Sequence, residues 1–179
     1  DVPDMAGLTL ATPTAEGSIT GIANGAGEDS TGQVGEIDIR TNTLNLNDNA
    51  AITIRAWSTV DEAIVAGIDP KTITIAAQTL NLTNGSWLSA GAFGNTDGHK
   101  IDLTASDRLL LQDSQILTSA TSGQGGDITI AAPNLLLRGG FIQANATTGV
   151  RGGDITIKAE AMIAEGGEVM VGGLARETF

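Results

Sequence analysis

Four aspartates and the only histidine of the chain fall within one short stretch, and they are the first candidates for chemistry. The carboxylates belong to Asp97, Asp102, Asp107 and Asp113, and the imidazole belongs to His99. A pair of carboxyl groups can cleave a glycosidic bond, one as general acid and the other as base or nucleophile. Acidic residues are common throughout this chain, however, and no cluster of Lys or Arg accompanies these four to bind an acidic sugar. We therefore favour a protein that is not an enzyme and assign no catalytic residue.

The single histidine also limits metal and nucleophilic chemistry. One imidazole cannot form a His pair around a metal, and it leaves no second candidate for a Ser-His-Asp relay. The sequence thus gives no cofactor-binding or metal-binding residue, and no cofactor is expected. We predict that His99 is a solvent-exposed residue of the turn NTDGHK.

A segment of unusual length, AWSTVDEAIVAGIDP from Ala56 to Pro70, is the second candidate. Long loops on a regular scaffold often carry binding function. The segment could form an acidic site with an aromatic neighbour, from Trp57, Asp61, Glu62 and Asp69. The favoured alternative is a loop whose apolar side chains cover one edge of the fold, namely Trp57, Val60, Ile64 and Val65.

Composition narrows the class of protein and of partner. The chain has 179 residues with 24 Gly, no Cys, no Tyr and three Phe, so its core must be aliphatic and it contains no disulfide. The net charge of −12 disfavours nucleic acid and anionic membranes as partners. No stretch is long and apolar enough to predict a membrane helix. The start DVPDMAGLTL lacks the features of a signal peptide, so an exported protein would contain this chain as a mature segment or internal fragment.

The candidate residues lie in a repeated unit. Three segments begin with nearly the same phrase, at Lys100, Gly126 and Gly153, and their leading isoleucines Ile101, Ile128 and Ile155 are 27 residues apart. A fixed period of this size is typical of a chain that stacks one structural unit.

Each unit contains three short alternating segments separated by turns, which is the period of two expected for strands with one buried face. The inward pairs predicted for the first strand are Ile37/Ile39, Ile73/Ile75, Ile101/Leu103, Ile128/Ile130 and Ile155/Ile157. Those for the second strand are Leu44/Leu46, Leu80/Leu82, Leu109/Leu111, Leu135/Leu137 and Met162/Ala164. Those for the third are Ile52/Ile54, Trp87/Ser89, Ile116/Thr118, Ile142/Ala144 and Val169/Val171, with a slip of one residue allowed in the first of these.

The natural closure of such a unit is an all-β parallel β-helix, in which each strand lies beside its copy in the next coil. We predict about five full coils of about 27 residues. Residues 1–35 form a partial coil at the N-terminal edge, residues 36–172 form the repeats with the insertion at 56–70, and residues 173–179 form a C-terminal tail. A leucine-rich repeat fits less well because Gly, Pro, Thr and Asn interrupt every candidate helix. A β-sandwich is disfavoured only by the internal repetition.

The repeat also predicts columns of outward residues. One column reads Glu36, Thr72, Lys100, Asp127, Asp154, and the next reads Asp38, Thr74, Asp102, Thr129, Thr156. Lys100 beside Asp127 is a favourable neighbour, whereas Asp127 beside Asp154 would repel unless solvent or an ion relieves the pair. The glycines of SGQGGD (122–127) and TGVRGGD (148–154) are predicted to supply positive φ angles at the turn that returns to the first strand.

The repeats GQGGDITIAAPNLLLRGGFIQANATTG and IDLTASDRLLLQDSQILTSATSGQGGDITI resemble those of large exoproteins of the filamentous haemagglutinin type, notably the cyanobacterial members often labelled S-layer-like. The resemblance covers about residues 32–172, and the family's N-terminal secretion domain with its NPNG-type motifs is not seen in this sequence. The resemblance implies a right-handed β-helix that is exported through an outer-membrane two-partner transporter and displayed on the cell surface.

The expected function is that of a non-enzymatic extracellular structural or adhesive segment, acting as a stalk or as a multivalent surface. Expected partners are a cell-surface or extracellular polysaccharide or protein and the transporter, with end-to-end self-association as a further possibility. The alternatives are a polysaccharide-active or carbohydrate-binding module and a self-assembling coat component.

Overall fold

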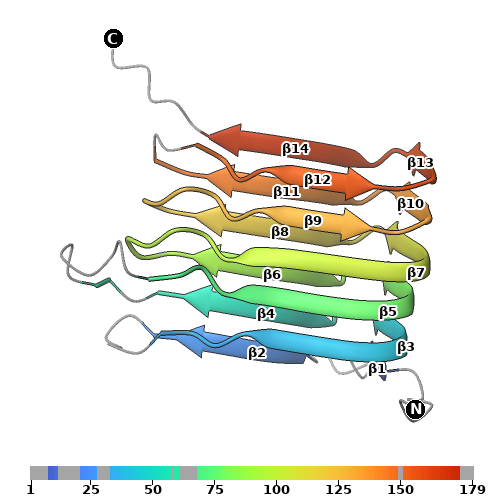
Figure 1. Ribbon diagram of the computed structural model, residues 1–179, viewed down its shortest axis with the longest axis horizontal. Helices are drawn as coiled ribbons and strands as arrows, with labels where there is room; N and C mark the ends of the chain where they lie inside the picture. The colour runs from blue at the N-terminus through green and yellow to red at the C-terminus, as the bar shows by residue number, and fades with distance from the viewer. Residues whose placement is uncertain are drawn as a thin grey trace.

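The computed structural model describes residues 8–11, 21–27, 33–57, 59–60, 68–148 and 151–173. These residues form fourteen β-strands and no helix, and the strands stack as a parallel β-solenoid of five full coils and one partial coil (Figure 1). The predicted fold class is therefore confirmed.

Two parallel sheets run the length of the stack. Sheet A contains β1 (Leu8–Ala11), β3 (Ile37–Asn47), β5 (Thr72–Thr83), β7 (Lys100–Gln112), β9 (Ile128–Ala131), β10 (Asn134–Arg138), β12 (Ile155–Lys158) and β13 (Ala161–Glu165). Sheet B contains β2 (Gly21–Ala26), β4 (Ala51–Ala56), β6 (Trp87–Ala92), β8 (Gln115–Ala120), β11 (Phe141–Ala146) and β14 (Glu168–Gly173).

The pairing register follows the repeat. The leading isoleucines are direct partners from coil to coil, as Ile73 with Ile101 and Ile101 with Ile128. The second-strand leucines form the same kind of column, which extends to Leu8 in the partial coil. The predicted first and second strands thus pair as the sequence indicates.

The predicted register of the third strand is wrong in one coil. The prediction placed Trp87 and Ser89 inward, but Leu88 and Ala90 are the buried partners of Ile52 and Ile54, and Trp87 faces outward. The preceding turn causes the shift, because it has two left-handed residues, Asn84 and Gly85, where later turns have one. Asp48 and Asn49 provide the same longer turn in the coil before.

The number of strands in a coil also differs from the prediction. In three coils the first two strands are one continuous strand, as in β3, β5 and β7, whereas the prediction separated them by a turn. They are separate only in the last two coils, where Pro133 follows β9. Proline removes a backbone donor and restricts the residue before it, which explains the interruption in its own coil.

The described glycines of the SGQGGD and TGVRGGD turns have a different role from the predicted one. The described glycines with positive φ are Gly85, Gly139 and Gly166, and all three lie in the turns before sheet B strands. At Gly126 a Cβ atom would lie 1.8 Å from the carbonyl oxygen of His99, and at Gly153 it would lie 2.0 Å from that of Gly126. These glycines are required because the backbones of successive coils approach too closely for any side chain.

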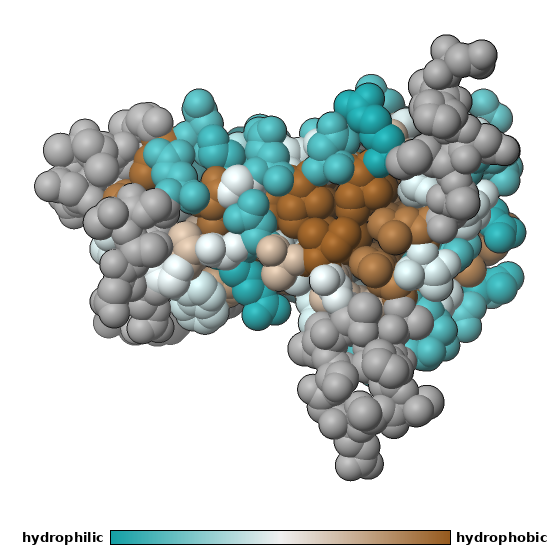
Figure 2. Space-filling view, turned by 90° about the horizontal axis from the view of Figure 1, so that it is seen from below, coloured by the Kyte–Doolittle hydropathy of each residue, from teal (hydrophilic) through white to brown (hydrophobic). Residues whose placement is uncertain are grey.

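The core is a set of aliphatic columns between the two sheets, and it extends to both ends of the stack. Ile73, Ile101 and Ile128 are fully buried, and each such side chain contributes about 1.5–3 kcal/mol. Figure 2 looks onto the N-terminal end and shows an apolar patch at its centre. The half-buried apolar residues at that end are Leu8, Leu10, Ile22 and Ile39. Met162, Ile163, Val169 and Val171 are exposed at the other end.

We expect Ile128→Asp to unfold the stack, because a carboxylate would then lie in an aliphatic column between Ile101 and Ile155. Circular dichroism and the melting temperature measure the effect. The matched control is Thr129→Asn at the neighbouring outward position, which should retain the native spectrum. A native β signal and an unchanged melting temperature for Ile128→Asp would contradict the register.

Candidate functional site

The insertion lies where the sequence places it, between β4 and β5. The connection runs from Trp57 to Lys71, whereas the equivalent connection between β6 and β7 runs only from Phe93 to His99. The start and end of the insertion are described, and both pack against the connection of the next coil. This edge of the solenoid is the candidate functional site.

An aromatic pair fixes the start of the insertion. The rings of Trp57 and Phe93 stack with their centroids 4.3 Å apart and their planes inclined by 21°. The backbone continues the sheet B ladder at the same place, since the Trp57 amide donates to the Ala26 carbonyl and the Phe93 amide donates to the Ala56 carbonyl. Trp57 therefore lies against Phe93 at this edge of the solenoid, while 43% of its surface stays exposed.

Asn95 holds the next part of the insertion. Its Oδ1 accepts a hydrogen bond of 2.9 Å from the Val60 amide, and its Nδ2 donates one of 2.7 Å to the Val60 carbonyl. The side-chain amide therefore satisfies both backbone groups of Val60, as a neighbouring strand would.

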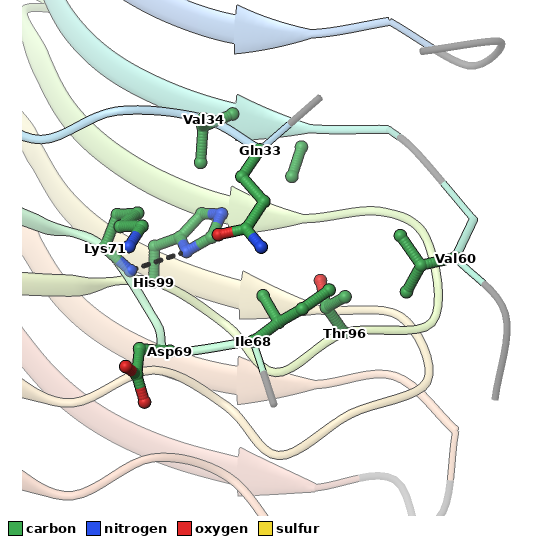
Figure 3. Close-up of a pocket in the computed structure, with 9 residues that line it drawn as sticks. Gln33, Val34, Val60, Ile68, Asp69, Lys71, Thr96 and His99 are labelled. Atoms are coloured by element: carbon green, nitrogen blue, oxygen red, sulfur yellow. Dashed lines mark hydrogen bonds between the residues drawn. The ribbon is translucent and has the colours of Figure 1, made fainter. Parts of the chain in front are cut away.

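His99 is buried beneath this segment, contrary to the prediction of a solvent-exposed turn residue. Its exposed fraction is 2%, and its Nδ1 accepts a hydrogen bond of 3.1 Å from the Lys71 amide (Figure 3). Because Nδ1 is the acceptor, a neutral ring carries its proton on Nε2, which has no hydrogen-bond partner in the structure. The polar turn sequence gave no sign of this burial, which arises because Val60 and Ile68 of the insertion lie nearby.

A small cavity adjoins the ring. Its volume is about 20 Å³, which is enough for about one water molecule. Gln33, Val34, Ala56, Val60, Ile68, Asp69, Lys71, Thr96 and His99 line it. A space of this size does not admit a sugar ring, and the contacts of Asn95 and His99 join the described ends of the insertion to the next coil.

Of the residues predicted for the insertion, Trp57, Val60 and Asp69 are described. Asp69 lines the cavity beside Lys71 and His99. Asp61, Glu62, Ile64 and Val65 lie outside the described residues.

The four aspartates of the enzymatic hypothesis are all exposed, and they occupy different parts of one coil. Asp97 lies in the turn before β7 and accepts a hydrogen bond from the Gln124 amide, Asp102 and Asp107 lie on β7, and Asp113 lies in the turn that follows. Within the described ranges, no group of three or more His, Asp or Glu side chains is placed to hold a metal ion.

The outward column through Lys100, Asp127 and Asp154 contains the predicted favourable pair, and protein groups neutralise the predicted repulsive pair. Lys100 Nζ lies 3.3 Å from Asp127 Oδ2, which confirms the favourable neighbour pair. The other oxygen of Asp127 accepts a hydrogen bond of 3.0 Å from the Asp154 amide, and Arg151 pairs with the Asp154 carboxylate. Protein groups thus relieve the repulsion between Asp127 and Asp154, although exposed pairs of this kind contribute at most about 1 kcal/mol each.

No protein-family model, curated protein or solved structure matches this chain. The resemblance to filamentous haemagglutinin-type repeats accordingly stays a hypothesis that rests on the repeats themselves. In the part of the chain that the structure describes, no helix is long and apolar enough to cross a membrane.

Burial makes His99 a source of pH-dependent stability. Burial, together with the charge of Lys71, lowers the pKa of His99 from 6.5 to about 4. The unfolded chain binds a proton at His99 below about pH 6.5, whereas the folded chain excludes it until about pH 4. The stability that the neutral ring provides is therefore complete above pH 6.5 and decreases as the pH falls toward 4, by about 3 kcal/mol at most.

We expect the free energy of unfolding, measured by urea denaturation between pH 7 and pH 4, to fall more steeply in the native chain than in His99→Asn. The amide of Asn can accept the Lys71 hydrogen bond but does not titrate in this range. Asp69, which also lines the cavity, is present in both proteins, so the difference between them isolates the imidazole. Equal pH profiles for the two proteins would contradict the buried neutral ring.

Proposed function

We propose that this chain is a non-enzymatic structural and adhesive β-helix segment of a large secreted exoprotein, located outside the cell or on its surface. The observation that supports this proposal is the continuous register of both sheets through five coils. Such a stack is a stiff support that presents its outward side chains in columns.

The proposed mechanism is multivalent. Adjacent coils are about 4.8 Å apart, so equivalent outward residues repeat along the axis at a spacing suited to an extended polymer. Many weak contacts along such a surface give an avidity that no single contact has. The proposed partners are a cell-surface or extracellular polysaccharide or protein. The net charge of −12 makes nucleic acid an unfavourable partner, and the protein is not proposed to insert into a membrane.

The proposed route of export is an outer-membrane two-partner transporter. The resemblance to filamentous haemagglutinin-type repeats supports passage through an outer-membrane two-partner transporter. Strands that pair only with their neighbours along one axis can form progressively as a chain emerges, because each coil contacts only the next.

A second candidate function is assembly into a coat by end-to-end stacking of coils. Apolar residues lie at both ends of the described coils, with Leu8 and Ile22 half-buried at one end and Met162 and Val169 exposed at the other. A contact between two different ends does not close on itself, so repeated stacking would give filaments.

Adhesion is tested with beads that carry the chain at low and high density on films of cellulose, laminarin, mannan and collagen. We expect retention under flow to rise more steeply than coating density on at least one film, because avidity requires several simultaneous contacts. Beads coated with the Ile128→Asp variant are the control. Absence of retention on every film would contradict the adhesive function, and release of reducing sugar from a film would favour the polysaccharide-active alternative.

Stacking of ends is tested by sedimentation of the chain over a hundredfold range of concentration. We expect concentration-dependent species that diminish in Val169→Lys, because a charge at the exposed apolar end opposes contact with a second apolar surface. Lys158→Gln, an outward change in the same coil, is the control. A single monomeric species at all concentrations would contradict end-to-end assembly.

A further inference from the structure

The outer face of sheet B differs in charge from the rest of the molecule. The chain contains 21 Asp and Glu residues, yet β2, β4, β6, β8 and β11 contain none. Arg55 is the single charged residue on these five strands. The sixth strand, β14, carries Glu168 in the same outward column as Phe141. On a strongly acidic protein, the carboxylate-free part of the face over the first five strands is a candidate surface for an uncharged partner.

The outward columns of this face contain aromatic rings and small residues. In one column Ala51 pairs with Trp87, Trp87 pairs with Gln115, and Gln115 pairs with Phe141. Gly21 precedes Ala51 in the same column. Because Gly21 and Ala51 have almost no side chain, the space beside Trp87 stays open toward the N-terminal end.

That space is a hollow of about 230 Å³. Gly21, Ile22, Ala23, Ala51, Thr53, Arg55 and Trp87 line it. Trp87 is half-buried, so its ring is held in place while part of it stays accessible. Binding pockets commonly combine such an apolar wall with a few fixed polar groups.

The polar groups of the hollow have no partners of their own. Thr53 is 7% exposed and its neighbour Ser89 is 4% exposed, and neither hydroxyl forms a hydrogen bond with another described residue. Neither oxygen is among the unpaired buried atoms of the described residues, so both reach solvent and can exchange a bound water for the hydroxyl of a ligand. Among the described residues, no carboxylate pairs with Arg55, so its five N–H donors are also free to bind.

We propose that the outer face of sheet B, centred on Trp87, Thr53 and Arg55, binds a neutral polysaccharide. A pyranose ring has an apolar face of C–H groups that can lie on the Trp87 indole, and its hydroxyls can exchange hydrogen bonds with Thr53 and Arg55. An anionic polysaccharide fits less well, because the net charge of −12 repels a polyanion from the molecule as a whole.

The outward columns indicate the direction in which a polysaccharide would bind. Trp87 and Phe141 occupy the same outward column two coils apart, which is about 10 Å along the axis. A polysaccharide that runs parallel to the axis would therefore contact Trp87 and then Phe141, with Gln115 between them. This inference rests on the proposed adhesive function and names the surface and the ligand class that would carry it.

The test uses tryptophan fluorescence in a Trp57→Phe background, in which Trp87 is the only tryptophan. Cellohexaose, laminarihexaose, maltohexaose and mannohexaose are the neutral probes, and polygalacturonate is the anionic probe. We expect saturable quenching or a shift of Trp87 emission with at least one neutral probe. Thr53→Val and Arg55→Gln, each with unchanged circular dichroism, should weaken that binding about tenfold, which is the loss expected for one hydrogen-bonding group.

Calorimetry of the native chain and of Trp57→Phe provides the matched control, since the two should bind the probe equally and Trp87→Ala should not bind it. Absence of binding to every neutral probe would overturn the proposal, as would preferential binding of polygalacturonate. If beads carrying Trp87→Ala with Thr53→Val still adhere as native beads do, this surface is excluded while the adhesive function stands. If native beads do not adhere at all, the adhesive function fails instead.

Discussion

Backbone hydrogen bonding between equivalent positions of successive coils is the constraint on which the rest of this structure depends. Each strand pairs in parallel with its copy one coil away, so every inward residue must lie on an inward residue of the next coil. A slip of one residue would turn an aliphatic column out to solvent. The constraint fixes the aliphatic columns, whereas the length of a coil can vary, as the pairing of Ile37 with Ile73 across the insertion shows. It also fixes the glycines at which two backbones almost touch, such as Gly126 and Gly153.

The same constraint explains which features the sequence predicts. The columns through Ile101 and Leu109 are visible in the sequence because period-two alternation and the repeat act together. Trp87 was misplaced because a turn with two left-handed residues differs from a turn with one by a single position, and the repeat alone does not resolve that difference. The burial of His99 could not be predicted, because it depends on an insertion that belongs to one coil and has no copy elsewhere.

Function on such a scaffold resides in departures from the regular columns. At the insertion edge, extra residues follow β4. Contacts of Trp57, Asn95 and His99 hold the described parts of this insertion against the coils. On the outer face of sheet B, the five strands from β2 to β11 carry no carboxylate, and Trp87 lies in one column with Gly21 and Ala51. The first departure leaves a cavity beside His99 with room for about one water. The second leaves a hollow lined by Trp87, Thr53 and Arg55, which is why the proposed ligand is placed on sheet B.

Disulfide trapping tests the in-register stack most directly, because the native chain has no cysteine that could interfere. Thr129 and Thr156 are direct partners on β9 and β12, so their Cα atoms should lie within the range of about 4.4–6.8 Å that a disulfide spans. Thr129 and Lys158 lie two residues out of register, and their Cα atoms should be too far apart. Mild oxidation followed by mass spectrometry should give a crosslink in the Thr129→Cys, Thr156→Cys protein and little in the Thr129→Cys, Lys158→Cys protein. The reverse order of yields, or equal yields, would contradict the stack.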